Sequence, residues 1–304
     1  MSASTLGQLP LSTLRTTMTQ GMRYRIGPFT IHLKNTADNI VPLMHTLYAD
    51  SSLADDEPIA DFHIQLHRPF GPRRWIRPKI NFIVDGRFPF DPFPLDTAFP
   101  MLEWGINWCI AMHAHQYLML HAGIVEKNGK AIIFPAWPGS GKSTLCAALM
   151  YNGWRLLSDE FGLVRLGSTE FTPLPRCIPL KNESIDVIGN YCSNAVLGPT
   201  FPKTRKGDVA HAKPTTDSML RAQETVRATA IVFPQYTRGA ACRLSPISKP
   251  RAFMKLSNNA FNYELVRRQG FEAITRIVRS CDCYLFEYSE LDDALTLFED
   301  MVSS

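Results

Sequence analysis

One short segment constrains the fold of this chain more than any other. Residues 136–144 read Ala-Trp-Pro-Gly-Ser-Gly-Lys-Ser-Thr. An apolar run typical of a strand, residues 131–134, comes before it, and residues 142–152, rich in good helix formers, follow it. A glycine-rich loop that ends in Gly-Lys-Ser between a strand and a helix is typical of the phosphate-binding P-loop. The sequence therefore predicts an α/β domain with this loop at the carboxyl end of a strand.

The residues of this loop predict a phosphate ligand. Successive backbone N–H groups of a P-loop turn inward as a nest for an anion, and the positive end of the helix dipole adds to it. We expect Lys142 to reach the β and γ phosphates of ATP, and Ser143 to place its hydroxyl on Mg²⁺, which prefers oxygen ligands. The first glycine of the pattern is Ala136 here, which stiffens the loop entry; an ordinary glycine- and serine-rich loop is the alternative. The residues expected to hold the nucleotide are Gly139, Ser140, Gly141, Lys142, Ser143 and Thr144.

An acidic pair follows the P-loop by one helix and one strand. Asp159 and Glu160 come soon after the apolar residues Leu156 and Leu157. Two carboxylates at the carboxyl end of a strand beside the P-loop strand can hold Mg²⁺ with one and accept a proton with the other. We therefore expect Ser143, Asp159 and Glu160 to hold Mg²⁺. The alternative is an acidic turn that caps the strand.

A histidine lies in the apolar run 117–125, which we interpret as the strand before the P-loop strand. His121 is costly there unless it is hydrogen-bonded, and a core histidine bonded to a backbone carbonyl is the alternative. Because a hairpin joins the two strands, we expect its imidazole to reach the acidic pair. His113 and His115 receive no role.

Two basic segments follow the acidic pair. Arg176 and Lys181 lie among prolines and apolar residues, and the Pro- and Gly-rich segment 198–214, which we expect to be an exposed loop, carries Arg205, Lys206 and His211. Arginine and lysine stabilise the negative charge that phosphoryl transfer spreads over oxygen atoms. We expect the acceptor to dock over these segments. A solvated face is the alternative.

Length and composition place the chain among globular proteins. Its 304 residues leave room for one large domain or two modest ones, and 45% of them are hydrophobic. Short apolar runs alternate with Pro, Gly and Asn near the start, so we expect a smaller β-rich N-terminal region over residues 1–95 and the α/β P-loop domain over residues 96–304. The proline-dense segment 89–100 is the expected connector.

Several classes of protein are excluded by charge and patterning. A net charge of +4 is too small for a surface that coats nucleic acid. The longest apolar-rich stretch, residues 99–125, is interrupted by polar residues, so no membrane span is expected. Seven cysteines without a C-x-x-C pair indicate neither a zinc ribbon nor a disulfide framework, and residues 1–10 lack the pattern of a signal peptide. We therefore expect a cytoplasmic protein.

Three motifs together resemble the catalytic domain of HPr serine kinase/phosphorylase, whose fold is akin to that of phosphoenolpyruvate carboxykinase. They are His-Ala-Gly at 121–123, the P-loop residues 138–144, and Leu-Ser-Asp-Glu at 157–160. From about residue 21 onward the chain is similar to the HPr-kinase-related kinase A family. This similarity rests on four more segments, residues 103–108, 153–162, 180–185 and 206–211.

The resemblance implies an ATP-dependent kinase that phosphorylates a serine hydroxyl of a small acceptor protein or peptide. In HPr kinase an Asp-Asp pair follows the P-loop, and its first carboxylate is the base, oriented by an upstream histidine. Asp159 and His121 stand at those positions, so Asp159, His121 and Lys142 are the expected catalytic residues. Glu160 replaces the second aspartate. Phosphorylase activity is not implied, because the elements on which it depends have no match here.

Other functions could use the same loop. A small-molecule kinase would use the same ATP site on a different acceptor. A nucleotide-gated binding module would need the P-loop and a moving loop, without catalysis. The sequence leaves open which of these acceptors is used, which nucleotide is preferred and whether the chain forms a homo-oligomer.

Overall fold

The computed structural model describes residues 4–69, 71 and 76–303. Contacts within the chain separate it into two compact units. Met1–Met112 and Val196–Lys213 form the first unit, and His113–Ala195 and Pro214–Ser304 form the second. The chain therefore passes between the units three times. The domain boundary expected at residue 95 stays a prediction.

The first unit is built on a mixed sheet. The strand order is β1 (Met22–Ile26), β2 (Phe29–Asn35), β3 (Phe62–His67), β4 (Lys79–Val84) and β5 (Phe93–Pro94). β2 and β3 are parallel, and the other neighbours are antiparallel. Side chains alternate in β3, where Phe62, Ile64 and Leu66 are buried, as in a sheet with one covered face. The helical elements are η1 (Leu6–Gln8), α1 (Leu11–Gln20), η2 (Asp38–Ile40), α2 (Val41–Leu47), η4 (Leu95–Thr97) and α3 (Ala98–His113).

The segment 89–100 is more ordered than a connector. It contains β5, η4 and the first turn of α3. Proline is tolerated on an edge strand and in the first turn of a helix, where no backbone donor is lost, so proline density did not exclude these elements.

The expectation of an exposed loop over residues 198–214 is wrong. Most of the segment is an antiparallel hairpin of β12 (Phe201–Thr204) and β13 (Gly207–Ala212), and the second half of β13 is buried. The rings of Phe201 and His211 lie 6.5 and 5.2 Å from that of Phe99 in the same unit. Contacts with a residue about 100 positions away therefore order a segment whose local composition indicates a loop.

The second unit contains a larger mixed sheet. Its strand order is β10-β9-β6-β7-β14-β16-β15, and β8 pairs with β6. β7, β14 and β16 are parallel neighbours, and the other pairs are antiparallel. The predicted α/β class is therefore confirmed. The strands are β6 (Tyr117–Lys127), β7 (Lys130–Pro135), β8 (Arg155–Ser158), β9 (Phe161–Arg165), β10 (Glu170–Thr172), β14 (Val226–Tyr236), β15 (Arg243–Pro246) and β16 (Asp282–Tyr288); β11 (Ile178–Lys181) also lies in this unit.

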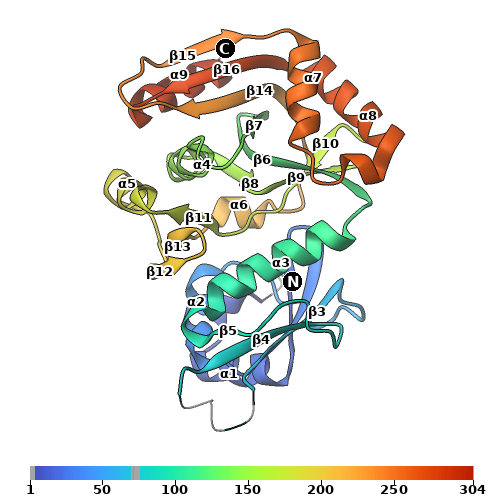
Figure 1. The fold of residues 1–304 in the computed structure, drawn as a ribbon, viewed down its shortest axis with the longest axis vertical. Helices are drawn as coiled ribbons and strands as arrows, with labels where there is room; N and C mark the ends of the chain where they lie inside the picture. The colour runs from blue at the N-terminus through green and yellow to red at the C-terminus, as the bar shows by residue number, and fades with distance from the viewer. Residues whose placement is uncertain (1–3, 70, 72–75, 304) are drawn as a thin grey trace. The chain divides into compact units, whose positions relative to one another are not determined.

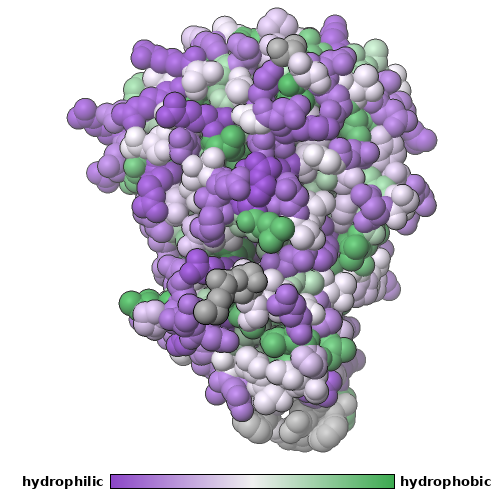
Figure 2. Space-filling view, turned by 180° about the vertical axis from the view of Figure 1, so that it is seen from behind, coloured by the Kyte–Doolittle hydropathy of each residue, from purple (hydrophilic) through white to green (hydrophobic). Residues whose placement is uncertain are grey.

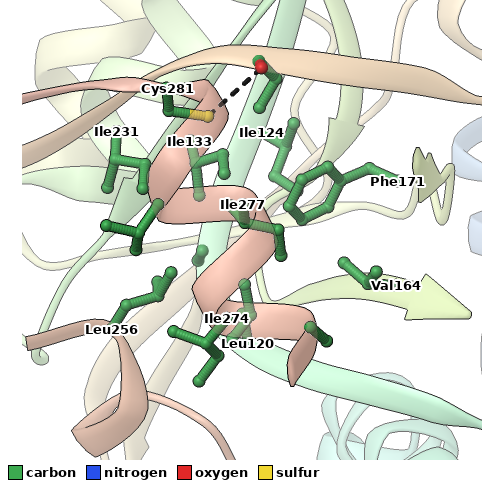
Figure 3. Close-up of a cluster of buried hydrophobic side chains, with 14 of the residues drawn as sticks. Leu120, Ile124, Ile133, Val164, Phe171, Ile231, Leu256, Ile274, Ile277 and Cys281 are labelled. Atoms are coloured by element: carbon green, nitrogen blue, oxygen red, sulfur yellow. Dashed lines mark hydrogen bonds between the residues drawn. The ribbon is translucent and has the colours of Figure 1, made fainter. Parts of the chain in front are cut away.

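Helices cover both faces of this sheet (Figure 1). Ile274 and Ile277 of α8 point toward Leu120 and Ile133 on one face (Figure 3). On the other face the ring of Phe134 contacts that of Phe298 at 5.2 Å. Ile133 and Phe134 face opposite ways because successive side chains of a strand alternate. The helices are α4 (Lys142–Tyr151), α5 (Glu183–Tyr191), α6 (Thr216–Leu220), α7 (Lys249–Asn258), α8 (Tyr263–Ser280) and α9 (Leu291–Ser303).

The surface is mainly hydrophilic on the face that Figure 2 shows, where hydrophobic residues form small, separate patches. Within the described part of the chain, none of the helices is long and apolar enough to cross a membrane.

Candidate functional site

The P-loop lies where the parallel strands of the second unit end. β7 ends at Pro135, α4 begins at Lys142, and β14 and β16, which run parallel to β7, end at Tyr236 and Tyr288. The predicted order of strand, loop and helix is therefore confirmed. The carboxyl edge of parallel strands is where α/β proteins place their ligands.

Two glycines of the loop adopt the left-handed backbone conformation. Gly139 and Gly141 have φ values of +89° and +86°, which residues with a side chain rarely adopt. Ser140 donates its N–H to the Trp137 carbonyl at 3.3 Å. Among the described residues, none accepts a hydrogen bond from the N–H of Gly139, Gly141 or Lys142. These three donors remain available to an anion such as a phosphate.

Three side chains meet at the start of α4. The Lys142 ammonium donates to Asp159 Oδ1 at 2.9 Å and also to the Asp159 carbonyl. The Ser143 hydroxyl donates to Asp159 Oδ2 at 2.8 Å. Each oxygen of one carboxylate thus binds one of the two P-loop side chains predicted to hold phosphate and Mg²⁺.

The Lys142–Asp159 pair is buried, with side-chain exposures of 7% and 4%. Burial by itself lowers the pKa of the Lys142 ammonium, but the charge and hydrogen bond of Asp159, together with Cys146 and Glu160, raise it by more, and the pKa of Lys142 is raised. Lys142 is therefore charged at physiological pH. A ligand that binds the Lys142 ammonium must provide an anionic group that stabilises its charge as well as Asp159 does.

His121 lies beside the acidic pair. It pairs with Phe161 in the β6–β9 ladder, and the next amide on its strand, that of Ala122, donates to the Glu160 carbonyl at 3.3 Å. Burial and the charge of Lys142 lower the pKa of His121, against the opposite effects of Glu160 and Asp159. The imidazole is therefore neutral near pH 7 and able to accept a proton or a hydrogen bond.

A glycine allows α4 to approach β6 closely. A Cβ atom at Gly123 would meet Cys146 Sγ and lie 3.4 Å from Lys142 Cγ. Cys146 is completely buried. The third residue of the His-Ala-Gly motif thus positions the helix that carries Lys142 and Ser143.

The other predicted nucleotide ligands lie on the loop and the first turn of α4. Ser140 is 8% exposed, and its hydroxyl has no hydrogen-bond partner among the described residues. Thr144 is half-buried in the first turn. A buried hydroxyl without a partner is costly, and a phosphate oxygen could accept its hydrogen bond.

The predicted acceptor-binding residues are divided between the units. Lys181 ends β11 in the second unit, and its charge contributes to lowering the pKa of His121, so it lies near His121. Arg176 is buried in the same unit. Arg205 and Lys206 are exposed in the turn of the first unit's hairpin, while His211 is 3% exposed and packs on Phe99. The expectation that His211 lies on an exposed loop is thus wrong.

Two residues at this edge had no signal in the sequence. Tyr236 donates its backbone N–H to the Ser140 carbonyl at 3.0 Å, and the Tyr288 hydroxyl donates to the Gly141 carbonyl at 3.1 Å. Both lie about 100 residues or more from the P-loop in the chain. Their contact with the loop depends on the parallel placement of β14 and β16 beside β7.

The donor set fits ATP with Mg²⁺. Mg²⁺ prefers hydroxyl, carboxylate and phosphate oxygens, and Ser143 and Asp159 supply the first two kinds at one point. The free N–H groups and the Lys142 ammonium suit phosphate oxygens. Comparison with protein-family models and with curated proteins finds no match to this chain. Membership of the HPr-kinase-related kinase A family therefore stays a prediction.

Proposed function

We propose that the second unit is a P-loop kinase that binds ATP with Mg²⁺ at residues 136–144. It transfers the γ-phosphoryl group to a serine hydroxyl of a small protein or peptide, as in the HPr-kinase-related family that the sequence resembles. The observation that carries this proposal is the meeting of Lys142 and Ser143 on the carboxylate of Asp159, beside free N–H groups of the loop.

The proposed roles follow from these contacts. Magnesium-bound ATP supplies an electrophilic phosphorus and a leaving group. The free amides of Gly139, Gly141 and Lys142 bind phosphate oxygens. The Lys142 ammonium turns from Asp159 Oδ1 to the phosphates and stabilises the charge that develops in transfer. Ser143 and Asp159, together with Glu160, supply the oxygen ligands for Mg²⁺.

The same acidic pair provides an acceptor for the proton that the serine hydroxyl loses. When Lys142 turns to the phosphates, Asp159 Oδ1 loses its donor and is able to accept the proton of the attacking hydroxyl. Glu160 and the neutral imidazole of His121 lie beside it. In this proposal His121 orients the Asp159 carboxylate, which keeps the proton that it accepts.

Nucleotide binding is the first test. Isothermal titration calorimetry should detect Mg·ATP binding to the wild type, and Lys142→Ala should slow phosphoryl transfer by about 100-fold or more. Lys130→Ala is the matched control, since Lys130 begins β7 at the end of the strand far from the loop. Absence of Mg·ATP binding to the wild type would contradict the proposal.

Transfer is the second test. The wild type is incubated with γ-labelled ATP and, in separate reactions, with the proteins encoded beside it or with small alcohols. Label on serine supports the kinase, and label on a small alcohol supports a small-molecule kinase. Binding of Mg·ATP without transfer to any acceptor supports the nucleotide-gated module instead.

A further inference from the structure

The ends of two strands hold two successive carbonyl groups of the P-loop. The backbone N–H at the end of β14, that of Tyr236, donates to the Ser140 carbonyl at 3.0 Å. The phenol at the end of β16, that of Tyr288, donates to the Gly141 carbonyl at 3.1 Å, which also accepts the N–H of Leu145 at 3.0 Å. Both carbonyl groups therefore point toward the strand ends or into the helix.

Fixing these carbonyls fixes the next amides. A trans peptide is planar, and its C=O and N–H point in opposite directions. With the Ser140 and Gly141 carbonyls held, the N–H groups of Gly141 and Lys142 point away from β14 and β16. These are two of the amides that have no acceptor among the described residues.

Steric contacts tie Gly141 to the same two tyrosines. A Cβ atom at Gly141 would lie 2.5 Å from Tyr288 Oη and 2.8 Å from Tyr236 Cβ. The positive φ of +86° also disfavours a side chain there. The strand ends therefore pack closely against the glycine and leave no room for a side chain at residue 141.

The phenol of Tyr288 is itself held rigidly. Its ring is 1% exposed, stacks on Phe286 with centroids 5.0 Å apart, and meets the Tyr236 ring edge-on at 5.8 Å. Burial raises the pKa of Tyr288, so the hydroxyl stays protonated and keeps its role as donor. Among the described residues, the buried Tyr288 hydroxyl makes one hydrogen bond, and its acceptor is the Gly141 carbonyl of the P-loop.

We propose that Tyr288 is a positioning residue of the phosphate site: its hydroxyl holds the Gly141 carbonyl so that the Lys142 amide faces the phosphates. This inference rests on the proposed function, because it needs a phosphate ligand at the loop. It adds a residue that the three motifs of the site do not contain.

Tyr288→Phe tests the inference, because it removes one oxygen and keeps the ring. We expect it to weaken binding of Mg·ATP and of inorganic pyrophosphate about five- to tenfold in calorimetry, as for the loss of one hydrogen bond. Tyr284→Phe is the matched control. It removes a hydroxyl from the same strand, and no hydrogen bond of that hydroxyl is found among the described residues. The control should bind both probes as the wild type does.

A second measurement separates positioning from general stability. In protein labelled with ¹⁵N-lysine, the Lys142 amide is assigned from the signal lost in Lys142→Arg. Pyrophosphate should move this signal downfield in the wild type and in Tyr284→Phe, and less in Tyr288→Phe.

The outcomes distinguish the inference from the function on which it rests. If the wild type binds neither Mg·ATP nor pyrophosphate, both the inference and the proposed function are wrong. If the wild type and Tyr288→Phe bind the probes with equal affinity, the inference alone is overturned. The same holds if the wild type binds pyrophosphate but the NMR signal of its Lys142 amide does not shift.

Discussion

At the scale of single residues, Asp159 is the residue that contacts both functional side chains of the P-loop helix. Its carboxylate is the buried counter-charge of Lys142 and the acceptor for Ser143. An amide at this position could still accept from Ser143, but it would leave the Lys142 charge unpaired. The observed charge balance of Asp159 can therefore be separated from its two proposed roles, metal binding and proton transfer.

Asp159→Asn should change stability and turnover in different ways. In the nucleotide-free protein we expect the free energy of unfolding to fall by about 3 kcal/mol, because a buried ammonium loses its partner. Mg·ATP should still bind and restore stability, but phosphoryl transfer should be lost, because an amide cannot accept the proton. Urea unfolding, calorimetry and transfer kinetics measure the three effects. Asp186→Asn, in the first turn of α5, is the matched control.

An equal loss of nucleotide affinity and of turnover in Asp159→Asn would have a different meaning. It would assign the carboxylate to Mg²⁺ alone and move the search for the base to Glu160.

His121 should make the stability of the nucleotide-free protein depend on pH. Burial and the charge of Lys142 lower its pKa in the folded protein below the ordinary histidine value of about 6.5, so at mildly acidic pH the unfolded chain binds the proton more readily than the folded one. The free energy of unfolding should then fall as pH drops below about 6.5, by at most about 1.4 kcal/mol per pH unit for this group.

The measurement is urea unfolding from pH 8 to pH 5. His121→Gln should flatten the slope below pH 6.5, and His113→Gln, at an exposed position, should leave it unchanged. An unchanged slope in His121→Gln would mean that His121 does not resist protonation in the folded state.

At the scale of secondary-structure elements, the close approach of α4 to β6 sets where the P-loop lysine lies. Gly123→Ala should push the helix away, because the added methyl group meets Cys146 Sγ. We expect the free energy of unfolding to fall by about 1–3 kcal/mol, with weaker Mg·ATP binding. Thermal unfolding and calorimetry measure both.

The double variant Gly123→Ala, Cys146→Ala is the matched test of that explanation. It makes space for the methyl group and should recover most of the loss. If it recovers nothing, the glycine is required for a reason other than this contact.

Elements coded locally could be predicted from the sequence, and those ordered by distant contacts could not. The helix after the P-loop begins at Lys142 as predicted, because the glycine-rich loop and the run of helix formers act within a few residues. Near the end of the chain the spacing of Leu291, Leu295 and Phe298 likewise indicates a helix, and α9 spans Leu291–Ser303. The hairpin β12–β13 was missed because Phe99 orders it.

The candidate site divides in the same way. The P-loop and the acidic pair were predicted from motifs, and the structure brings Lys142, Ser143 and Asp159 together. Tyr288 was missed, since nothing local distinguishes a tyrosine at the end of a strand. Only the sheet order, which places β16 beside β14, brings it to Gly141.

At the scale of the whole molecule, the two units divide the predicted functions. The residues predicted to bind the nucleotide belong to the second unit, and the exposed basic pair Arg205 and Lys206 belongs to the hairpin of the first. We expect the double variant Arg205→Ala, Lys206→Ala to bind Mg·ATP as the wild type does. Its kcat/KM for the acceptor should fall about tenfold or more, as for lost charge-assisted hydrogen bonds.

Steady-state kinetics with the true acceptor measure this prediction. Lys34→Ala, at an exposed position of β2 in the same unit, is the matched control. Unchanged kinetics in the double variant would make the basic turn a solvated surface.

The placement of the β12–β13 hairpin in the first unit also affects how the chain is made. A ribosome that has finished residue 112 must add about 100 more residues before synthesis of the hairpin is complete, which takes about 5–20 s at typical rates of synthesis. Until then Phe99 lacks the rings of Phe201 and His211 that pack on it in the finished protein. The strand, loop and helix of the candidate site are translated during this interval, so the unit that begins first is completed only after the residues of the candidate site have been made.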